Sequence, residues 1–261
     1  WGQSKYSNDL SSLNFGLFTS LSFDLTVTSI YLPLISGREL NIFNSTSDVS
    51  TLLKEYFESE VSCIKLTPAH ISLLGPLGLK STKVQVTIVG GEKLEGAHVE
   101  RLRALNPAIR IYNEYGPTES TVGCTIKEIG FEKEAILIGC PIANTQIYIL
   151  SETGHLLAKG LTGEIFIGGD GLARGYLNQP ELTAEKFVKN PFVEGKRLYK
   201  TGDLGRWQLD GNIQYIGRKD DQVKIRGYRI ELGEIEHALE QNKEIRQAVV
   251  LAKENKSGEK E

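Results

Sequence analysis

The sequence contains no methionine and only three cysteines among its 261 residues. Cys63, Cys124 and Cys140 are far apart, odd in number, and each is embedded in an apolar run. This pattern argues against structural disulfides and against a zinc site. It predicts buried thiols in a reducing compartment, which we expect to be the cytoplasm.

Long apolar runs and an excess of basic charge are also missing. No apolar run approaches the ~18 to 20 residues that span a bilayer, and the N-terminal WGQSKYSNDL lacks the basic and apolar regions of a signal peptide. Lysine and arginine number 30 against 33 acidic residues, a net charge of −3, with both signs interleaved along the chain. A nucleic-acid binder carries a basic footprint instead. We therefore expect no membrane segment, no secretion signal and no nucleic-acid partner.

The two ends of the sequence favour a longer parent protein. The first residue is Trp1, and the last residues, KENKSGEKE, follow an apparent strand, AVVLA, that has no partner segment after it. We therefore expect the chain to be a piece of a longer one, truncated at both ends. Its length still allows one large domain or two modest ones with a sizeable core.

Strand-like and helix-like segments alternate from Leu10 to about Val122. The stretches IYLPLISG, VSCIKLT, VQVTIVGG and AIRIYNEYG predict short buried strands, whereas VSTLLKEYFES and EGAHVERLRALN have the apolar spacing of helices. Such alternation favours a parallel α/β sheet. We expect this α/β part to occupy residues 1–135.

The pattern changes from about Ile136. Short β-rich runs separated by Gly, Asn and Asp predict an antiparallel barrel or meander over residues 136–219. The charged GRKDDQVKIRG follows, and then RIELGEIEHALEQN, in which the spacing of Ile235, Ala238 and Leu239 predicts a helix. We place an interdomain joint here and expect residues 220–261 to form a third, incomplete part.

Four short stretches combine glycine with polar side chains. They are VGGE (Val89 to Glu92), YGPTE (Tyr115 to Glu119), IGGDGLARGYL (Ile167 to Leu177) and YKTGDLGR (Tyr199 to Arg206). Glycine lets backbone N–H groups approach a ligand closely, and open α/β sheets bind ligands where strands end. Each stretch alone is a weak signal, because an isolated glycine-rich turn is often only a tight turn.

Taken in order, five longer stretches carry a family resemblance. They are FDLTVTSIYLPLISG, NEYGPTES, GEIFIGGDGLARGYLNQPELTAEKF, YKTGDLGRW and GRKDDQVKIRGYRIELGEIE. Over almost the whole chain they resemble the adenylate-forming superfamily, specifically the amino-acid adenylation domains of nonribosomal peptide synthetases. The resemblance implies an ANL-type α/β fold: a parallel α/β subdomain, a β-rich barrel-like subdomain, and the start of a small α+β C-terminal domain.

The same resemblance implies an activity and its partners. Such domains activate an amino acid with ATP and Mg²⁺ to an aminoacyl-AMP plus pyrophosphate, and pass it to the phosphopantetheine thiol of a peptidyl carrier protein. A condensation domain and an MbtH-like accessory protein are the further expected partners. Family members also carry an upstream Ser/Thr/Gly-rich loop with a lysine that grips ATP, and a C-terminal lysine that contacts the substrate carboxylate. Neither lies within these 261 residues, so we expect the chain by itself to adenylate poorly or not at all.

By similarity, NEYGPTE and YKTGDL hold the nucleotide. Tyr115 would stack against adenine, Thr118 would hydrogen-bond the α-phosphate, and Glu119 would coordinate Mg²⁺, which prefers hard carboxylate oxygens. Asp203 would accept hydrogen bonds from the ribose hydroxyls. The implied nucleotide-binding residues are Asn113, Tyr115, Gly116, Thr118, Asp203 and Arg218, and the implied catalytic residues are Thr118, Glu119 and Asp203. Without the resemblance, a helix-capping carboxylate is the preferred interpretation of Glu119, and an ordinary turn aspartate is that of Asp203.

The resemblance also makes Asp220 a hinge, about which the small C-terminal domain rotates between the adenylation and thioester-forming states. Lys224, Arg226 and Gly227 would then face the pantetheine tunnel. The alternative for this segment is a solvated charged hairpin.

Nine residues are implied to line the amino-acid pocket: Asp24, Leu25, Thr28, Lys65, Ile88, Gly90, Glu114, Val122 and Gly123. Asp24 would pair with the α-ammonium group. Lys65 and Glu114 carry opposite charges, and leaving either unpaired in a closed pocket is costly. A primary carboxamide offers a carbonyl to Lys65 and an N–H to Glu114, whereas a carboxylate would be repelled by Glu114. We predict asparagine, with aspartate or glutamine as alternatives, and a Lys65–Glu114 salt bridge that ignores the ligand stays open.

Two further classes remain as alternatives. An acyl- or aryl-acid ligase is a related chemistry, but such enzymes lack the ammonium partner at the position of Asp24. A noncatalytic binding or interaction module is the alternative from a different class. The four histidines, at positions 70, 98, 155 and 237, are scattered, and we assign none of them a catalytic role.

Overall fold

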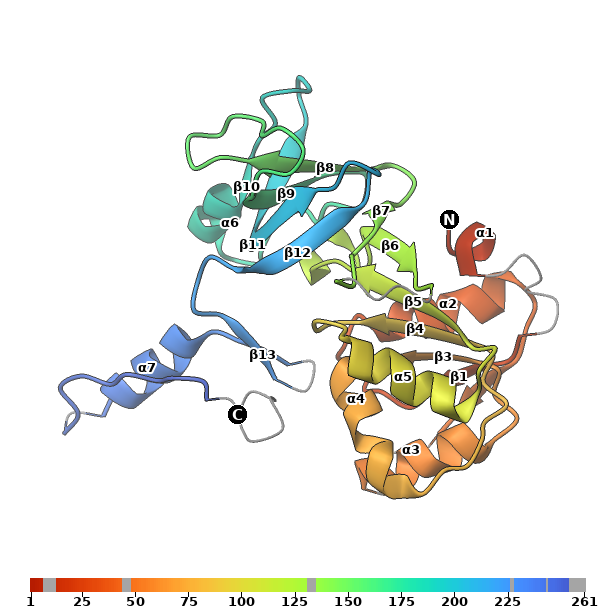
Figure 1. Cartoon of the computed structure of the whole chain (residues 1–261). Helices are drawn as coiled ribbons and strands as arrows, with labels where there is room; N and C mark the ends of the chain where they lie inside the picture. The colour runs from red at the N-terminus through yellow and green to blue at the C-terminus, as the bar shows by residue number, and fades with distance from the viewer. Residues whose placement is uncertain (7–12, 44–47, 131–134, 226–227, 243, 254–261) are drawn as a thin grey trace.

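The computed structural model describes residues 1–6, 13–43, 48–130, 135–225, 228–242 and 244–253. Figure 1 shows a layered α/β part, a β-rich part that follows it in the chain, and a C-terminal arm that leaves the β-rich part and carries a projecting helix.

The first part is built on a seven-stranded sheet with the order β2-β1-β3-β4-β5-β6-β7. The strands are β1 (Phe15–Leu17), β2 (Leu40–Ile42), β3 (Cys63–Leu66), β4 (Val86–Gly90), β5 (Arg110–Tyr115), β6 (Thr125–Glu128) and β7 (Cys140–Pro141). Strands β1 to β5 pair in parallel, and β6 and β7 are antiparallel additions at one edge. The expected parallel α/β sheet is confirmed.

Helices cover both faces of this sheet (Figure 1). They are α1 (Gly2–Tyr6), α2 (Thr26–Ile35), α3 (Val49–Glu58), α4 (Pro68–Leu73) and α5 (Gly96–Leu105), with a 3₁₀ turn η2 (Gly75–Leu77). Leu53, Ile71 and Leu102 from α3, α4 and α5 belong to one buried cluster, and Tyr6 and Leu32 from α1 and α2 belong to another. The site described below lies on the α1–α2 side.

The expected strand IYLPLISG is wrong, because this segment belongs to helix α2. Its buried residues, Thr26, Ser29, Leu32 and Pro33, recur at helical spacing, while Tyr31 on the other side is 60% exposed. A continuous apolar run carries no period that distinguishes a strand from a helix, so local sequence favoured the wrong element. The segments VSTLLKEYFES and EGAHVERLRALN are helical as expected.

The second part is an antiparallel five-stranded sheet, as expected from its short β-rich runs. Its order is β10-β11-β9-β8, with β12 paired to β11. The strands are β8 (Thr145–Leu150), β9 (Gly163–Gly169), β10 (Phe187–Lys189), β11 (Arg197–Trp207) and β12 (Ile213–Arg218), and helix α6 (Pro180–Lys186) precedes β10. Ile147, Ile165 and Ile213 are among the isoleucines of its core.

The C-terminal arm contains a hairpin of β13 (Val223–Ile225) and β14 (Tyr228–Ile230), followed by helix α7 (Leu232–Glu240). The predicted helix is confirmed, although Ile235 and Leu239 are exposed. The expected strand AVVLA is wrong: residues 248–252 have no strand assignment, and Val249 and Leu251 are exposed. The predicted part boundaries, 1–135, 136–219 and 220–261, stay predictions.

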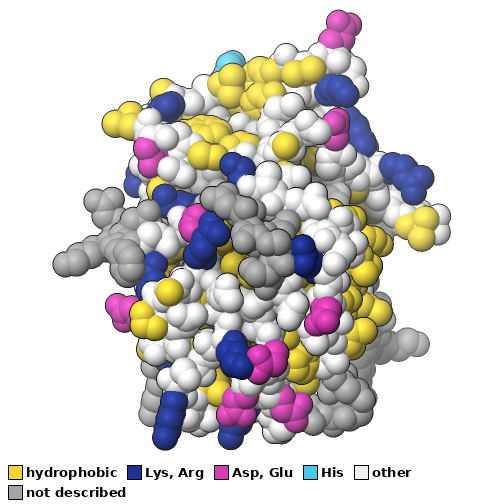
Figure 2. Space-filling view, turned by 90° about the vertical axis from the view of Figure 1, so that its right-hand side faces the viewer, with side chains coloured by type: hydrophobic (Ala, Val, Ile, Leu, Met, Phe, Trp, Pro, Cys, Tyr) yellow, Lys and Arg dark blue, Asp and Glu magenta, His cyan; other side chains and the backbone are white. Residues whose placement is uncertain are grey.

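The cysteines and the surface complete the description. Cys63 and Cys124 are buried as expected, but Cys140 is exposed, because β7 lies at the edge of the sheet. On the face in Figure 2, basic and acidic side chains are interspersed among hydrophobic patches. Within the ranges described above, no helix is both long and apolar enough to cross a membrane.

Candidate functional site

The predicted site residues gather where β3, β4 and β5 end, beside the start of α2 and the turn that follows β5. Lys65, Gly90 and Glu114 occupy the last two positions of their strands, and Gly90 lies in register with Glu114. Lys65 is in register with Ile88, two residues before Gly90, so all four lie on the same face of the sheet. The carboxyl ends of parallel strands are where open α/β sheets hold ligands.

At this edge Lys65 and Glu114 pair with each other. The Lys65 Nζ lies 2.5 Å from Glu114 Oε1, and the two side chains are only 2% and 3% exposed. Nζ also donates to Thr28 Oγ1 at 2.8 Å. The structure thus contains the salt bridge that sequence reasoning left open, so these two charges satisfy each other.

Tyr6, which sequence reasoning missed, completes this network. Its hydroxyl donates to Glu114 Oε2, and its ring is fully buried. Thr28, Lys65, Glu114 and Tyr6 therefore form one chain of buried polar contacts that links α2, β3, β5 and α1. Tyr6 precedes Glu114 by 108 positions, and no local pattern points from one to the other.

The start of α2 supplies the remaining residues on this side. Asp24 and Leu25 are half-buried in the turn that leads into the helix. Thr28 lies in the first turn of α2, four positions after Asp24. The contact from Thr28 to Lys65 joins the start of α2 to the buried pair.

The turn after β5 closes against Glu114. A Cβ placed on Gly123 would lie 2.6 Å from Glu114 Cδ, so a residue larger than glycine would push the end of this side chain aside. Thr121 and Val122 have φ values of 62° and 69°, a left-handed conformation that β-branched residues seldom adopt. Backbone strain of this kind persists where the surrounding structure enforces it, often at functional sites.

A second polar cluster surrounds Asp203. Tyr115 donates to Asp203 Oδ2 at 2.6 Å and Arg218 Nη1 to Oδ1 at 2.8 Å. Asp203 is 5% exposed and lies in β11 at a break in the register with β9. Such breaks re-aim side chains away from the ladder. Burial, and then the Asp203 charge, raises the pKa of Tyr115, which keeps its hydroxyl a donor.

Arg218 and Asn113 lie at the border of this cluster. Arg218 also donates to both oxygens of Asp220 at 2.6 Å each, so one guanidinium joins the predicted ribose ligand to the predicted hinge. Asn113 alternates with Glu114 along β5 and therefore faces the same side as Tyr115. Its amide donates to the Leu137 carbonyl at 2.9 Å.

The predicted metal ligand Glu119 is held by side chains. Arg229 Nη1 lies 2.8 and 3.1 Å from its two oxygens, and the Tyr176 hydroxyl donates to Oε1 at 2.6 Å. Burial by itself would raise the pKa of Glu119, but the Tyr176 hydrogen bond and the Arg229 charge outweigh it and lower that pKa. Thr118 is exposed at the start of the adjacent 3₁₀ turn η3 (Thr118–Ser120).

Glu119 can supply one protein ligand to a magnesium ion, but it cannot complete the coordination of the ion by itself. Mg²⁺ is commonly held by one or two carboxylates together with substrate phosphates and water. Among the residues with described positions, no group of three or more His, Cys, Asp or Glu side chains could hold a metal. Glu119 therefore fits as a single protein ligand, on condition that Arg229 withdraws from its oxygens.

The C-terminal hairpin reaches this region with two cations. Besides Arg229, it carries Lys224. Burial lowers the pKa of Lys224, although the negative charges of Asp203 and Asp24 act in the opposite direction. The family resemblance implied a tunnel role for Lys224, whereas nothing in the sequence singled out Arg229. Arg226 and Gly227, expected on the same segment, lie outside the described residues.

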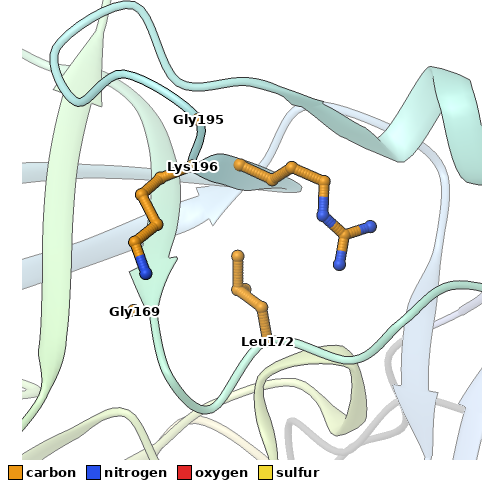
Figure 3. A pocket seen from close by; sticks show the side chains of 5 residues that line it. Gly169, Leu172, Gly195 and Lys196 are labelled. Carbon is orange, nitrogen blue, oxygen red and sulfur yellow. The ribbon is translucent and has the colours of Figure 1, made fainter.

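Two hollows lie elsewhere. Figure 3 shows the first, of about 170 Å³, where the Lys196 amine points toward Gly169 and Leu172 lies across from it. The second, of about 480 Å³, lies between the end of α5 and the edge of β5, near Arg103 and Ile109. Neither hollow is lined by a predicted site residue.

Comparison with known proteins identifies the class. The AMP-binding enzyme family matches residues 4–177, and the chain belongs to this family. The chain is 46% identical over 252 residues to bacitracin synthase 3 of Bacillus licheniformis, which is 95% of this chain and 4% of that protein. It is 42% identical over 263 residues to tyrocidine synthase 3 of Brevibacillus parabrevis, which is 99% of this chain and 4% of that protein.

Solved structures agree with this class. PA1221 in its holo form, a nonribosomal peptide synthetase protein with adenylation and PCP domains, superimposes with a TM-score of 0.86 at 29% identity, over 98% of this chain and 46% of that one. The Vibrio cholerae adenylation domain AlmE, solved with glycyl-adenosine-5'-phosphate, gives 0.84 at 27% identity, over 95% and 48%. The resemblance to synthetase adenylation domains and the ANL-type fold are thus confirmed. The chain spans about half the length of these structures and 4% of each of the two synthases.

Proposed function

We propose that the chain is part of an amino-acid adenylating ligase that prefers asparagine. A carboxylate oxygen of the amino acid attacks the α-phosphorus of ATP, the bond to pyrophosphate breaks, and an aminoacyl-AMP forms. Phosphoryl chemistry of this kind requires positioning and charge neutralisation rather than a nucleophile from the protein. The residues of the site therefore act as clamps.

The cluster around Asp203 is proposed to hold the nucleotide. Each oxygen of Asp203 accepts one hydrogen bond from the protein, and a carboxylate oxygen has two lone pairs, so both can still accept from a ribose hydroxyl. The ring of Tyr115 would contact the adenine, with Asn113 and Gly116 beside it, and Thr118 would donate to the α-phosphate. When bound, Mg²⁺ neutralises phosphate charge, and Glu119 is the residue that would hold it.

The buried pair is proposed to select the amino-acid side chain. Lys65 Nζ uses two of its three N–H groups, for Glu114 and Thr28, and keeps one donor. Glu114 accepts one bond on each oxygen and keeps acceptor capacity on both. A carboxamide matches this remaining set, with its carbonyl toward Lys65 and its N–H toward Glu114. Asp24 would receive the α-ammonium group.

A side-chain carboxylate matches the same set poorly. It has no hydrogen to donate to Glu114, and two buried carboxylates repel each other. Glutamine has the carboxamide but one methylene more, a difference that pockets discriminate by only about 1 to 3 kcal/mol. The charge pattern therefore favours asparagine over aspartate, while glutamine is disfavoured by size alone.

The transfer step and the partners are proposed from the relatives. PA1221 combines adenylation and PCP domains in one protein, which supports a carrier protein with a phosphopantetheine thiol as the acceptor of the activated amino acid. The arm that carries Asp220 and Lys224 would then change position between the two half-reactions. A condensation domain and an MbtH-like protein remain predicted partners.

The observation that carries this proposal is the Lys65–Glu114 pair at the carboxyl edge of the sheet, next to the Asp203 cluster. The test is amino-acid-dependent pyrophosphate exchange with all twenty amino acids, on the protein in which the chain naturally occurs. Asparagine is expected to give the highest kcat/KM, and a preference for aspartate would refute the pairing argument. Calorimetric titration of this chain with AMP and asparagine separates a ligase part from an unrelated interaction module, which would bind neither.

A further inference from the structure

Tyr6 contacts the selecting carboxylate from a helix that precedes all the family motifs. It is the last residue of α1, and its hydroxyl donates to Glu114 Oε2. Its ring is fully buried and lies edge-on to Tyr112, with ring centroids 5.3 Å apart at 80°. The ring is therefore held by packing, and the hydroxyl is aimed at one oxygen of Glu114.

The Glu114 carboxylate is restrained on every side that the described residues supply. Lys65 binds Oε1, Tyr6 binds Oε2, and the Gly123 backbone lies against the end of the side chain. A terminal carboxylate torsion is otherwise broad and roughly two-fold. Two donors on different oxygens set this rotation, and Lys65 alone would leave Oε2 without a donor.

We infer that Tyr6 is a positioning residue for amino-acid selection, whose hydroxyl sets the rotation of the Glu114 carboxylate and thereby the lone pairs offered to the amino-acid side chain. The inference rests on the proposed function of the same pocket. Burial, and then the charge of Glu114, raises the pKa of the Tyr6 phenol, so the hydroxyl remains a donor. Because the Tyr6 hydroxyl always donates to Oε2, the remaining lone pairs of the Glu114 carboxylate point in a fixed direction. This arrangement suits an N–H group on the ligand.

The direct test is Tyr6→Phe, which removes one oxygen and keeps the ring. A hydrogen bond to a charged group contributes about 1.5 to 3 kcal/mol, so we expect the KM for the preferred amino acid to rise about tenfold or more. The ratio of kcat/KM values for asparagine over aspartate is expected to fall by a similar factor. The KM for ATP and the kcat at saturating amino acid are expected to stay within about twofold, since Asp203 and its partners are untouched.

Tyr112→Phe is the matched control. Tyr112 packs against Tyr6, but its hydroxyl accepts from Arg110 rather than facing Glu114. Loss of this hydroxyl is expected to leave the amino-acid preference unchanged. An equal change in preference for both variants would overturn the inference, because the effect would then come from the shared aromatic packing.

A double-mutant cycle tests whether Tyr6 acts through Glu114. In a Glu114→Ala background, Tyr6→Phe is expected to change the KM by less than about twofold, because the group it positions is gone. Full additivity of the two effects would refute a positioning role. If Tyr6→Phe does not fold by circular dichroism, Glu114→Gln tests the contact from the other side, since an amide at this position loses one acceptor. An unchanged amino-acid preference in Glu114→Gln would then overturn the inference.

The assay is pyrophosphate exchange on the protein in which the chain naturally occurs. The wild type is measured first with all amino acids, and a preferred substrate other than asparagine refutes the asparagine proposal. The Tyr6→Phe comparison is then made with whichever amino acid the wild type prefers. Failure of the proposed substrate and failure of the role of Tyr6 are therefore separate results.

Discussion

Removal of Lys65 should destabilise the fold far more than removal of a lysine in an ion pair of the same length. Lys65 and Lys83 each place Nζ 2.5 Å from a glutamate oxygen, in Glu114 and Glu60 respectively. The first pair is 2% and 3% exposed, and the second is 65% and 79% exposed. Lys65→Met and Lys83→Met therefore change the same contact in two environments.

The expected magnitudes follow from burial. Removing one partner of a buried pair leaves an uncompensated charge and costs about 3 to 5 kcal/mol. An exposed pair contributes at most about 1 kcal/mol, because water and salt screen it. With a urea m-value of about 2 to 3 kcal/mol/M, Lys65→Met should lower the unfolding midpoint by roughly 1 to 2 M. Lys83→Met should shift it by less than about 0.5 M.

The assay is urea unfolding followed by circular dichroism, at low and at high salt. Salt should reduce the small effect of Lys83→Met and leave that of Lys65→Met nearly unchanged. The double variant Lys65→Met/Glu114→Leu should recover part of the lost stability, because it removes the stranded charge. Equal midpoint shifts for the two single variants would refute the reasoning from burial.

Three further predictions concern the site and its surroundings. Arg229→Gln should lower the Mg²⁺ concentration at half-maximal pyrophosphate exchange by about threefold to tenfold, because Glu119 is no longer held by a guanidinium that is itself partly exposed. Gly123→Ala should raise the KM for the amino acid by about tenfold, because its Cβ would lie 2.6 Å from Glu114 Cδ and displace the carboxylate. Burial lowers the pKa of His70 in the folded protein to about 4. A histidine in the unfolded chain has a pKa of about 6.5, so between pH 6.5 and pH 4 the unfolded chain binds one proton more than the folded protein. The free energy of unfolding, measured with urea, should therefore fall by up to about 3 kcal/mol from pH 6.5 to pH 4. The His70→Gln variant should not show this part of the decrease.

Each of these predictions has a control in the same chain. Lys189→Gln removes an exposed positive charge from β10 and should leave the Mg²⁺ dependence unchanged. Gly96→Ala adds a methyl group where no atom lies within 4 Å and should leave the KM unchanged. His155→Gln alters an exposed histidine and should keep the wild-type dependence of stability on pH. A control that behaves like its partner variant contradicts the corresponding prediction.

Much of the fold followed from local sequence. The strands within VSCIKLT, VQVTIVGG and AIRIYNEYG were correctly predicted, because short apolar runs bounded by glycine or polar residues have few alternatives. The segment IYLPLISG was not, since an unbroken apolar run fits a buried strand and a helix equally. Cys140 was expected to be buried because its neighbours are apolar, yet it lies on a two-residue edge strand. Position within a sheet depends on long-range pairing, which local composition does not encode.

The candidate site divides in the same way. The sequence by itself determined the chemical groups: a carboxylate at Asp24, opposite charges at Lys65 and Glu114, and a carboxylate at Asp203, because residue type sets which groups a side chain can recognise. Only the tertiary structure decided their partners. Tyr6 reaches Glu114 across 108 positions, and Arg229 reaches Glu119 across 110. A buried charge binds the complementary group that the fold brings within reach, and no local pattern specifies which distant residue that will be.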